Sequence, residues 1–199
     1  MSRYKGPRLK ITRRLGELPG LTGKKSIRQT ANLKKKSSQY GIRLETKQKL
    51  RYHYGITEKK LIQYVQKARR LKGSTGEILL QLLDKMMRLD NILFRVGFAP
   101  TISAARQLIS HGHILINNSK INIPSYSCQL NDQILIRKKT GSSNWLKNLL
   151  RKVGNKNLIP SHLKVNPEEL KVDILDNIQY SEVGLNLNEL LIIEYYSRS

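Results

Sequence analysis

The segment from Arg88 to Ile136 constrains the fold more than any other part of this 199-residue chain. Its apolar residues first recur three and four positions apart, which is the spacing of one helix face, and they are Leu89, Ile92, Leu93 and Val96. A second stripe of this kind follows Gly97 and comprises Ile102, Ala105, Leu108 and Ile109. The segment therefore predicts two short amphipathic helices that bury their apolar faces in a common core.

The pattern then changes from helical spacing to alternation, which is typical of a half-buried strand. The segments HILIN (113–117) and KINI (120–123) predict two strands, each with isoleucines directed to one face. Residues 117–119, Asn-Asn-Ser, predict a tight turn between them, because asparagine tolerates a positive φ. Residues 134–137 predict a third strand, so this part of the sequence indicates an α+β fold.

The charge of the chain is high and unevenly distributed. The formal net charge is +23, and residues 1–88 hold 24 Lys and Arg against 5 acidic residues. Residues 89–159 carry +8, whereas residues 160–199 carry −4. Such an excess predicts binding to a polyanion, and the asymmetry favours nucleic acid over a merely solvated basic face. We expect the N-terminal half to contact phosphate and the C-terminal end not to.

The flanks of the central segment differ in how regular they are. Residues 1–45 mix Gly, Pro, Ser and Lys without periodicity, and they predict an extended basic arm with little regular structure. Helical spacing begins at residues 46–54, continues through residues 57–72 and resumes after Ser74. The apolar segment 186–199 predicts a closing helix that docks on another part of the protein.

Several classes of function are disfavoured by the residues that the chain lacks. Cys128 is the single cysteine, so no internal disulfide and no cysteine-based metal cluster can form. His111 and His113 have no carboxylate or cysteine at ligand spacing, and we expect an RNA-contacting or structural role for them. Phosphate-binding glycine loops, nucleophile motifs and paired acids are not visible. We therefore expect no enzyme activity, no metal, no cofactor and no membrane span.

Two kinds of side chain leave alternatives open. Asp90 either holds an arginine by an ion pair or complements the dipole of the helix that it begins. Tyrosines interleaved with basic residues either stack on unpaired bases or fill the core. We expect Tyr64, on an apolar stripe, in the core, and Tyr4, in the arm, in contact with RNA.

A known family shares these features in the same order. The blocks RLDNILFRVGF, ARQLISHGHILIN, IPSY and ND resemble the S4 RNA-binding domain. The flanking blocks SRYKGPRLKITRRLGELPGLT, SQYGIRLETKQKLRYHYGITEKKL, ARRLKGSTGE and NELLIIEYYSRS resemble ribosomal protein S4 of the small subunit. The likeness covers nearly the whole chain, and the chain is similar in form to the plastid-encoded members of the family.

The resemblance implies an α+β fold in which a mostly helical domain surrounds an inserted S4-type RNA-binding domain. That inserted domain has two short helices and a small antiparallel sheet, and an extended basic arm precedes it. The expected domains are the arm 1–45, the helical domain 46–87 closed by the helix 186–199, the RNA-binding domain 88–140, and a variable connecting region 141–185.

The resemblance also implies a function. The family binds small-subunit (16S) rRNA, nucleates assembly of the subunit body, and contributes to translational accuracy. It lies near the channel through which mRNA enters and contacts ribosomal protein S5. We expect the plastid (chloroplast) stroma as the location and no homo-oligomer. The alternatives are an RNA-modifying enzyme and a non-ribosomal RNA-binding factor that carry the same module.

Matching positions give the expected RNA-binding residues. In the S4-type domain they are Arg88, Arg95, Ser103, Arg106, Gln107 and His111. In the arm they are Arg3, Tyr4, Lys5, Arg8, Arg13 and Arg14. Basic residues of the helical domain complete the set, namely Lys47, Arg51, Arg69, Arg70 and Lys72. Some members bind zinc or an iron–sulfur cluster through four arm cysteines, but this arm has none, so we expect no metal.

Overall fold

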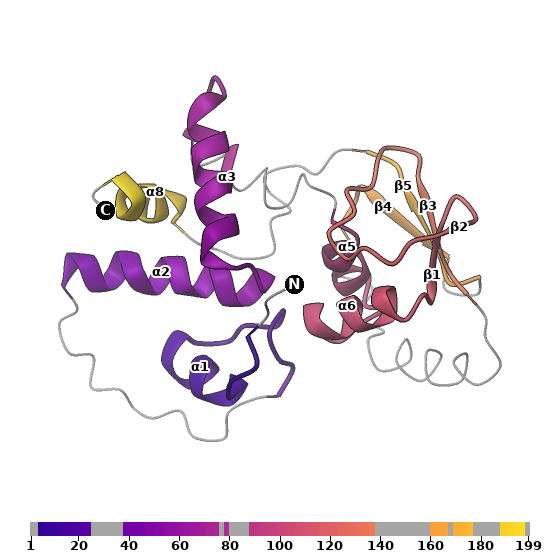
Figure 1. The fold of residues 1–199 in the computed structure, drawn as a ribbon, viewed down its shortest axis with the longest axis horizontal. Coiled ribbons are helices and arrows are strands. Elements are labelled where there is room, and N and C mark those ends of the chain that lie inside the picture. Colours follow the sequence, from indigo (N-terminus) through magenta and orange to yellow (C-terminus); the bar gives the residue numbers. More distant parts are fainter. Residues whose placement is uncertain are drawn as a thin grey trace. The chain divides into compact units, whose positions relative to one another are not determined.

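The computed structural model describes residues 4–24, 38–75, 78–79, 88–137, 160–166, 169–176 and 188–197. The chain forms two compact units (Figure 1). The helical unit comprises Met1–Leu83 together with Val183–Ser199, and the sheet unit comprises Asp84–Glu182. The C-terminal segment thus returns to the helical unit after the sheet unit is complete.

The helical unit contains α1 (Arg8–Leu15), α2 (Gln39–Tyr54), α3 (Glu58–Arg70) and α8 (Glu189–Ser197). The second helix begins seven residues before the predicted start at residue 46. It begins there because Ser38 Oγ accepts a hydrogen bond from the backbone N–H of Gly41 at 3.1 Å, which satisfies one of the donors exposed at a helix start. Tyr64, on α3, is buried as predicted.

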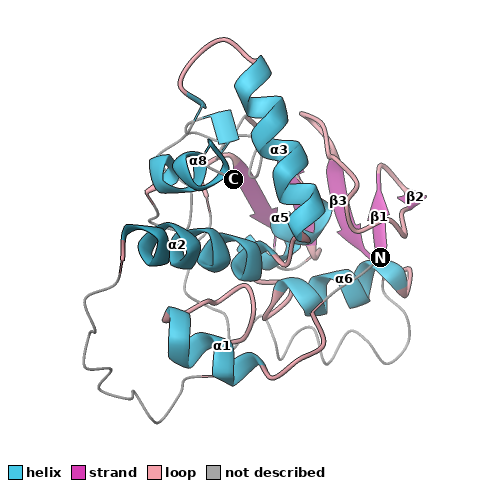
Figure 2. Ribbon diagram, turned by 60° about the vertical axis from the view of Figure 1, so that its left-hand side comes forward, coloured by secondary structure: helices cyan, strands magenta, loops and turns pink. Residues whose placement is uncertain are grey.

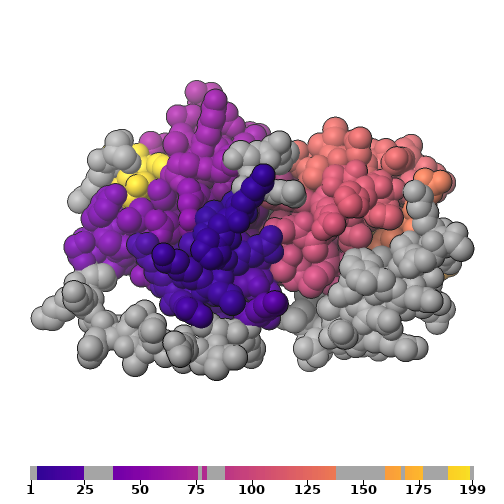
Figure 3. Space-filling view, turned by 60° about the horizontal axis from the view of Figure 1, so that its bottom comes forward, coloured from indigo at the N-terminus to yellow at the C-terminus, as the bar shows by residue number. Residues whose placement is uncertain are grey.

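The prediction of an extended arm with little regular structure is wrong for Arg8–Leu15, which is α1. Three leucines, spaced at three-residue intervals in and after this helix, form a small buried cluster against Ile11 and Tyr52; they are Leu15, Leu18 and Leu21. This apolar spacing is hidden in the sequence by the basic residues around it. Figure 3 shows the N-terminal segment, in indigo, lying against the purple surface of the helical unit.

Glu58, in the first turn of α3, joins three helices of this unit. Its carboxylate accepts hydrogen bonds from Lys47 Nζ of α2 at 2.9 Å and from the Tyr196 hydroxyl of α8 at 2.6 Å. Burial alone would raise the pKa of Glu58, but these two donors outweigh it and lower the pKa. Lys47 also lies 4.3 Å from the centre of the Tyr195 ring. The predicted docking of the closing helix is therefore confirmed: α8 packs on α2 (Figure 2).

In the described part of the sheet unit, two short helices pack against a five-stranded antiparallel sheet. The strand order is β2-β1-β3-β5-β4. The elements are α5 (Leu89–Arg95), α6 (Ile102–Ser110), β1 (Ile114–Ile116), β2 (Ser119–Lys120), β3 (Gln133–Ile136), β4 (Leu163–Asn166) and β5 (Lys171–Ile174). The predicted helix pair and the third strand are confirmed within one or two residues.

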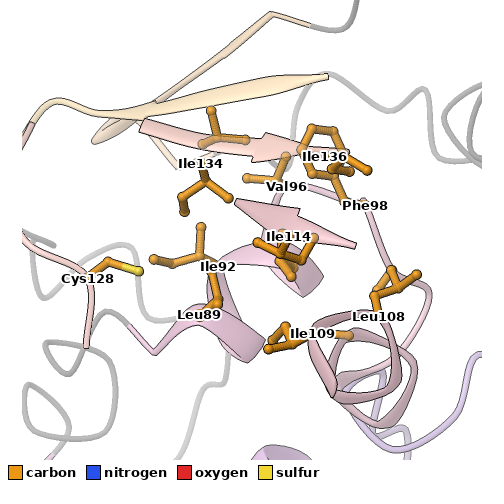
Figure 4. Packing of buried hydrophobic residues seen from close by; sticks show 14 of the residues in the cluster. Leu89, Ile92, Val96, Phe98, Leu108, Ile109, Ile114, Cys128, Ile134 and Ile136 are labelled. Atoms are coloured by element: carbon orange, nitrogen blue, oxygen red, sulfur yellow. The ribbon is translucent and has the colours of Figure 1, made fainter. Parts of the chain in front are cut away.

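The core of the sheet unit forms where the two helical stripes meet the sheet (Figure 4). Leu89 of α5 and Ile109 of α6 are fully buried, as are Ile114 of β1 and Ile134 of β3. Cys128 joins this core as a small apolar residue, and burial with two nearby acids raises the pKa of its thiol to about 12. A thiol with such a pKa is a poor nucleophile at neutral pH.

The turn between β1 and β2 is confirmed, since Asn117 and Asn118 have φ values of +47° and +66°. The second strand is Ser119–Lys120, so the prediction of a strand is wrong for residues 121–123. The chain leaves the sheet because the carbonyls of Pro124 and Tyr126 accept hydrogen bonds from the first-turn N–H groups of α5. These donors have no partner inside their own helix, so residues 123–127 provide hydrogen-bond acceptors for the start of α5 and do not continue the strand.

Two strands lie in the region that the sequence left as a variable connection. The predicted region 141–185 contains β4 and β5, and β5 pairs with β3. Alternating Val172 and Ile174 are buried against the core, but the run is only four residues long. The spacing of Trp145, Leu146, Leu149 and Leu150 predicts a further short helix, and these residues lie outside the described ones.

Candidate nucleic-acid interface

Asp90 organises the surface formed by α5 and α6. Its side chain is only 2% exposed, and both oxygens accept hydrogen bonds from arginine. Arg88 donates from Nε to Oδ1 at 3.0 Å and from Nη2 to Oδ2 at 2.9 Å. Arg106 of α6 donates from Nε to Oδ2 at 2.7 Å. The first of the two open interpretations of Asp90 is confirmed, since it forms ion pairs with two arginines. Asp90 also lies in the first turn of α5, where a negative charge complements the helix dipole.

The helix α6 carries further polar residues predicted to face RNA. Thr101 begins this helix, and its hydroxyl accepts a hydrogen bond from the N–H of Ala104 at 3.2 Å. Gln107 and His111 are exposed, while Ser103 is half-buried. The apolar stripe of α6 is in the core, so these polar side chains necessarily occupy the outer side of the helix.

Arg95, at the end of α5, is half-buried, and its position in the last turn complements the helix dipole. Arg88 is buried, and Arg106 is half-buried with a side chain 12% exposed. The structure therefore brings Arg88 and Arg106 together around one acid. Each is held in one hydrogen-bonded cluster, and a small part of each side chain is exposed, 11% for Arg88 and 12% for Arg106.

The helical unit divides the predicted basic residues into two groups. Lys47 is buried, and together with Arg51 it pairs with Glu58, so these two hold helices together. By contrast, the remaining predicted residues of this unit that the structure describes are exposed, and they are Tyr4, Lys5, Arg8, Arg13, Arg14, Arg69, Arg70 and Lys72. Arg3 lies outside the described residues.

Tyr4 and Tyr52 make an edge-to-face contact beside the basic face of α1. Their ring centres are 5.2 Å apart, and the guanidinium of Arg51 lies 4.7 Å from the Tyr52 ring centre. Tyr4 remains 40% exposed. An exposed aromatic ring among basic residues can stack on an unpaired base, so the geometry is compatible with the predicted role of Tyr4.

Lys120 is a candidate that the sequence prediction missed. It is exposed at the end of the β1–β2 hairpin, and its side chain lies where a methyl group on Gly112 would be. Gly112 has a φ of +72° and directly follows His111, so Lys120 adds a positive charge beside the end of α6. Only the hairpin register, which sequence spacing alone leaves open, brings the two positions together.

Within the described ranges, no three His, Cys, Asp or Glu side chains gather in a way that could hold a metal ion. None of the helices in the described part of the chain has the length and apolarity needed to cross a membrane.

Known proteins match the chain over its whole length. It is 55% identical to small ribosomal subunit protein uS4c of Oltmannsiellopsis viridis, with all of both chains covered. It is 54% identical to uS4c of Rhodomonas salina and 52% identical to uS4 of a Nostoc species, covering 100% of this chain and 99% of each relative. The chain belongs to the small ribosomal subunit protein uS4 family.

Family models divide the uS4 chain much as the structure does. The ribosomal protein S4/S9 N-terminal domain matches residues 3–84, and the S4 domain matches residues 87–134. The first match lies in the helical unit except for its last residue, and the second lies entirely in the sheet unit. The Asp90 cluster thus belongs to the S4 domain, and β4 and β5 follow the matched segment.

Proposed function

We propose that this protein is a non-catalytic structural constituent of the small ribosomal subunit that binds small-subunit rRNA. The observation that carries the proposal is the α5–α6 surface of the S4 domain, where two arginines are fixed around Asp90 next to exposed Gln107 and His111. The full-length relatives named as small ribosomal subunit proteins support it independently. They also remove the support for an RNA-modifying enzyme.

The mechanism combines two contributions with different chemistry. Exposed basic side chains on α1 and α3 neutralise phosphates without regard to sequence, and this part of the affinity falls steeply as salt rises. The α5–α6 surface recognises the shape of a folded RNA through fixed donors at defined positions. We assign the direct RNA contacts to the exposed residues and to the arginines of the Asp90 cluster, and we assign Lys47 and Arg51 to holding the helical unit together.

The finer parts of the proposal follow from the family resemblance. The protein acts in a plastid ribosome, and the chloroplast-type names of the relatives support this assignment. We propose the stroma as its compartment. We further propose that it nucleates assembly of the subunit body and contacts ribosomal protein S5 near the channel where mRNA enters. Through that contact it contributes to translational accuracy.

Direct binding to rRNA tests this proposal. The full-length protein is titrated against in vitro transcribed small-subunit rRNA and, separately, against poly(U), at several salt concentrations. We expect rRNA to bind roughly a thousandfold more tightly than poly(U), with the ratio increasing as salt rises, because shape-specific contacts are less salt-sensitive than phosphate contacts. Equal affinity for both RNAs at every salt concentration would contradict the proposal.

A further inference from the structure

Asp90 is a buried acid that pairs with two arginines, although one of them already engages both of its oxygens. A buried carboxylate is costly unless it is paired and hydrogen-bonded. Arg88 alone satisfies both oxygens, because its two N–H donors reach Oδ1 and Oδ2. The structure nevertheless brings Arg106 from α6 to the same Oδ2 at 2.7 Å. Arg106 therefore adds a second cation, from a different helix, to an acid that already pairs through both oxygens.

Gathering two arginines around one acid has an electrostatic consequence. The guanidiniums of Arg88 and Arg106 repel each other, and Asp90 between them offsets that repulsion. Together the three groups carry a charge of +1 in one place. A site that concentrates cations in this way attracts an anion, and backbone phosphate is the anion that RNA supplies.

The contact with Nε also fixes geometry. A guanidinium is planar, so a hydrogen bond from Nε to a buried carboxylate sets the plane of the group and the direction of its terminal nitrogens. Asp90 engages Nε of both arginines. It lies in the first turn of α5, whereas Arg106 lies in the second turn of α6, so the same contact fixes how the two helices present their outer sides.

We propose that Asp90 is a positioning residue for RNA binding, which holds the guanidiniums of Arg88 and Arg106 in a fixed orientation for a backbone phosphate. The inference rests on the proposed function and adds to it an acidic residue within a surface that binds a polyanion. Preorganisation is the physical advantage, because a side chain that is already ordered loses less conformational freedom when the RNA arrives. Asp90 itself makes no contact with RNA.

This role predicts an effect opposite in sign to that of simple charge. Asp90→Asn raises the net charge of the protein by one, which by long-range attraction alone tightens binding to RNA. If Asp90 positions the arginines, the same change weakens binding to small-subunit rRNA, by roughly tenfold, since hydrogen bonds to charged groups are the strong ones. Non-specific binding to poly(U) stays equal or tightens slightly.

The control is a substitution with the same charge change elsewhere in the sheet unit. Glu169 is exposed and lies away from α5 and α6 in the sequence, just before β5. Glu169→Gln also raises the net charge by one, and we expect it to leave rRNA affinity equal or slightly higher. Both variants are measured as full chains at a temperature at which circular dichroism shows each to be folded.

A double-mutant cycle separates positioning from a general loss of structure. Arg106→Lys keeps the positive charge but removes the Nε donor, so it should weaken rRNA binding to a similar extent. If Asp90 acts through Arg106, the double variant loses little more than either single variant. If Asp90→Asn does not fold at the assay temperature, Arg106→Lys alone carries the test.

Two results would overturn the inference. One is Asp90→Asn binding rRNA as tightly as the parent protein or more tightly, as Glu169→Gln does. The other is a folded Arg106→Lys variant with unchanged rRNA affinity. Failure of the parent protein to prefer rRNA over poly(U) would instead contradict the proposed function, so the two failures are distinguishable.

Discussion

Phe98→Ala should lower the free energy of unfolding of the sheet unit by about 3–5 kcal/mol, the range typical of a buried aromatic residue truncated to alanine. Phe98 is fully buried and belongs to the core where α5 and α6 meet the sheet. Its removal leaves a cavity that neighbouring isoleucines cannot fill without leaving their rotamers. Because a single domain is stable by only about 5–15 kcal/mol, this loss is a large share of the stability expected of the sheet unit.

Hydrogen exchange of backbone amides in β1 and β3 measures this loss in the sheet unit alone, since those strands belong to it. Leu130→Ala is the matched control, because Leu130 belongs to the same unit but is 45% exposed. We expect the control to change stability by no more than about 0.5 kcal/mol. Equal losses of protection in the two variants would show that Phe98 is not a core residue.

The second large effect concerns affinity for RNA. We expect Arg13→Gln combined with Arg14→Gln to weaken rRNA binding roughly tenfold, since each exposed ionic contact contributes up to about 1 kcal/mol after screening. Both arginines are exposed in the last turn of α1, on a helix without acidic residues in its first turn. The slope of log affinity against log salt should become less steep by about 2, which is the number of phosphate contacts removed.

A pair of lysines provides the matched control for charge. Lys164→Gln with Lys171→Gln also removes two positive charges, but from β4 and β5. These strands lie within residues 160–199, which carry a net charge of −4. We expect little change in either affinity or salt slope, because the net negative charge of residues 160–199 predicts that they do not lie on phosphate. If the two double variants lose affinity equally, binding depends on total charge and α1 has no special position in it.

Local patterns were enough to predict the centre of the fold. The stripes that begin at Leu89 and Ile102 predicted α5 and α6, because the partners of these helices are close in sequence. The Asn117-Asn118 turn was predictable from the intrinsic tolerance of asparagine for positive φ, and both residues adopt it.

Elements that depend on distant partners were not predictable. The short strand β5 is stabilised by pairing with β3, about forty residues earlier, and its own four residues carry too weak a pattern. The helix α1 is held by leucines that pack on Tyr52 of α2. The high charge of this segment gave no indication of that packing. Likewise, residues 121–123 do not form the predicted strand, since the chain leaves the sheet there and the carbonyls of Pro124 and Tyr126 accept hydrogen bonds from the first turn of α5.

The candidate site also has features that local sequence patterns predicted and features that depend on contacts between distant residues. The spacing of apolar residues predicted that the polar side chains of α6 lie on its outer side, and Gln107 and His111 are indeed exposed. Composition could not predict that Lys47 would be enclosed by Glu58 and Tyr195, since those contacts join α2 to α3 and α8. The shared pairing of Asp90 with two arginines likewise required the packing of α6 on α5.

The most direct test of the central claim is sedimentation of a plastid lysate through a high-salt sucrose gradient, with antibody detection of this protein. A constituent bound by shape-specific rRNA contacts is expected to remain with the small subunit, in an amount equal to other subunit proteins, at a salt concentration that strips proteins held by phosphate attraction alone. Release of the protein into the soluble fraction at that salt concentration would contradict the account.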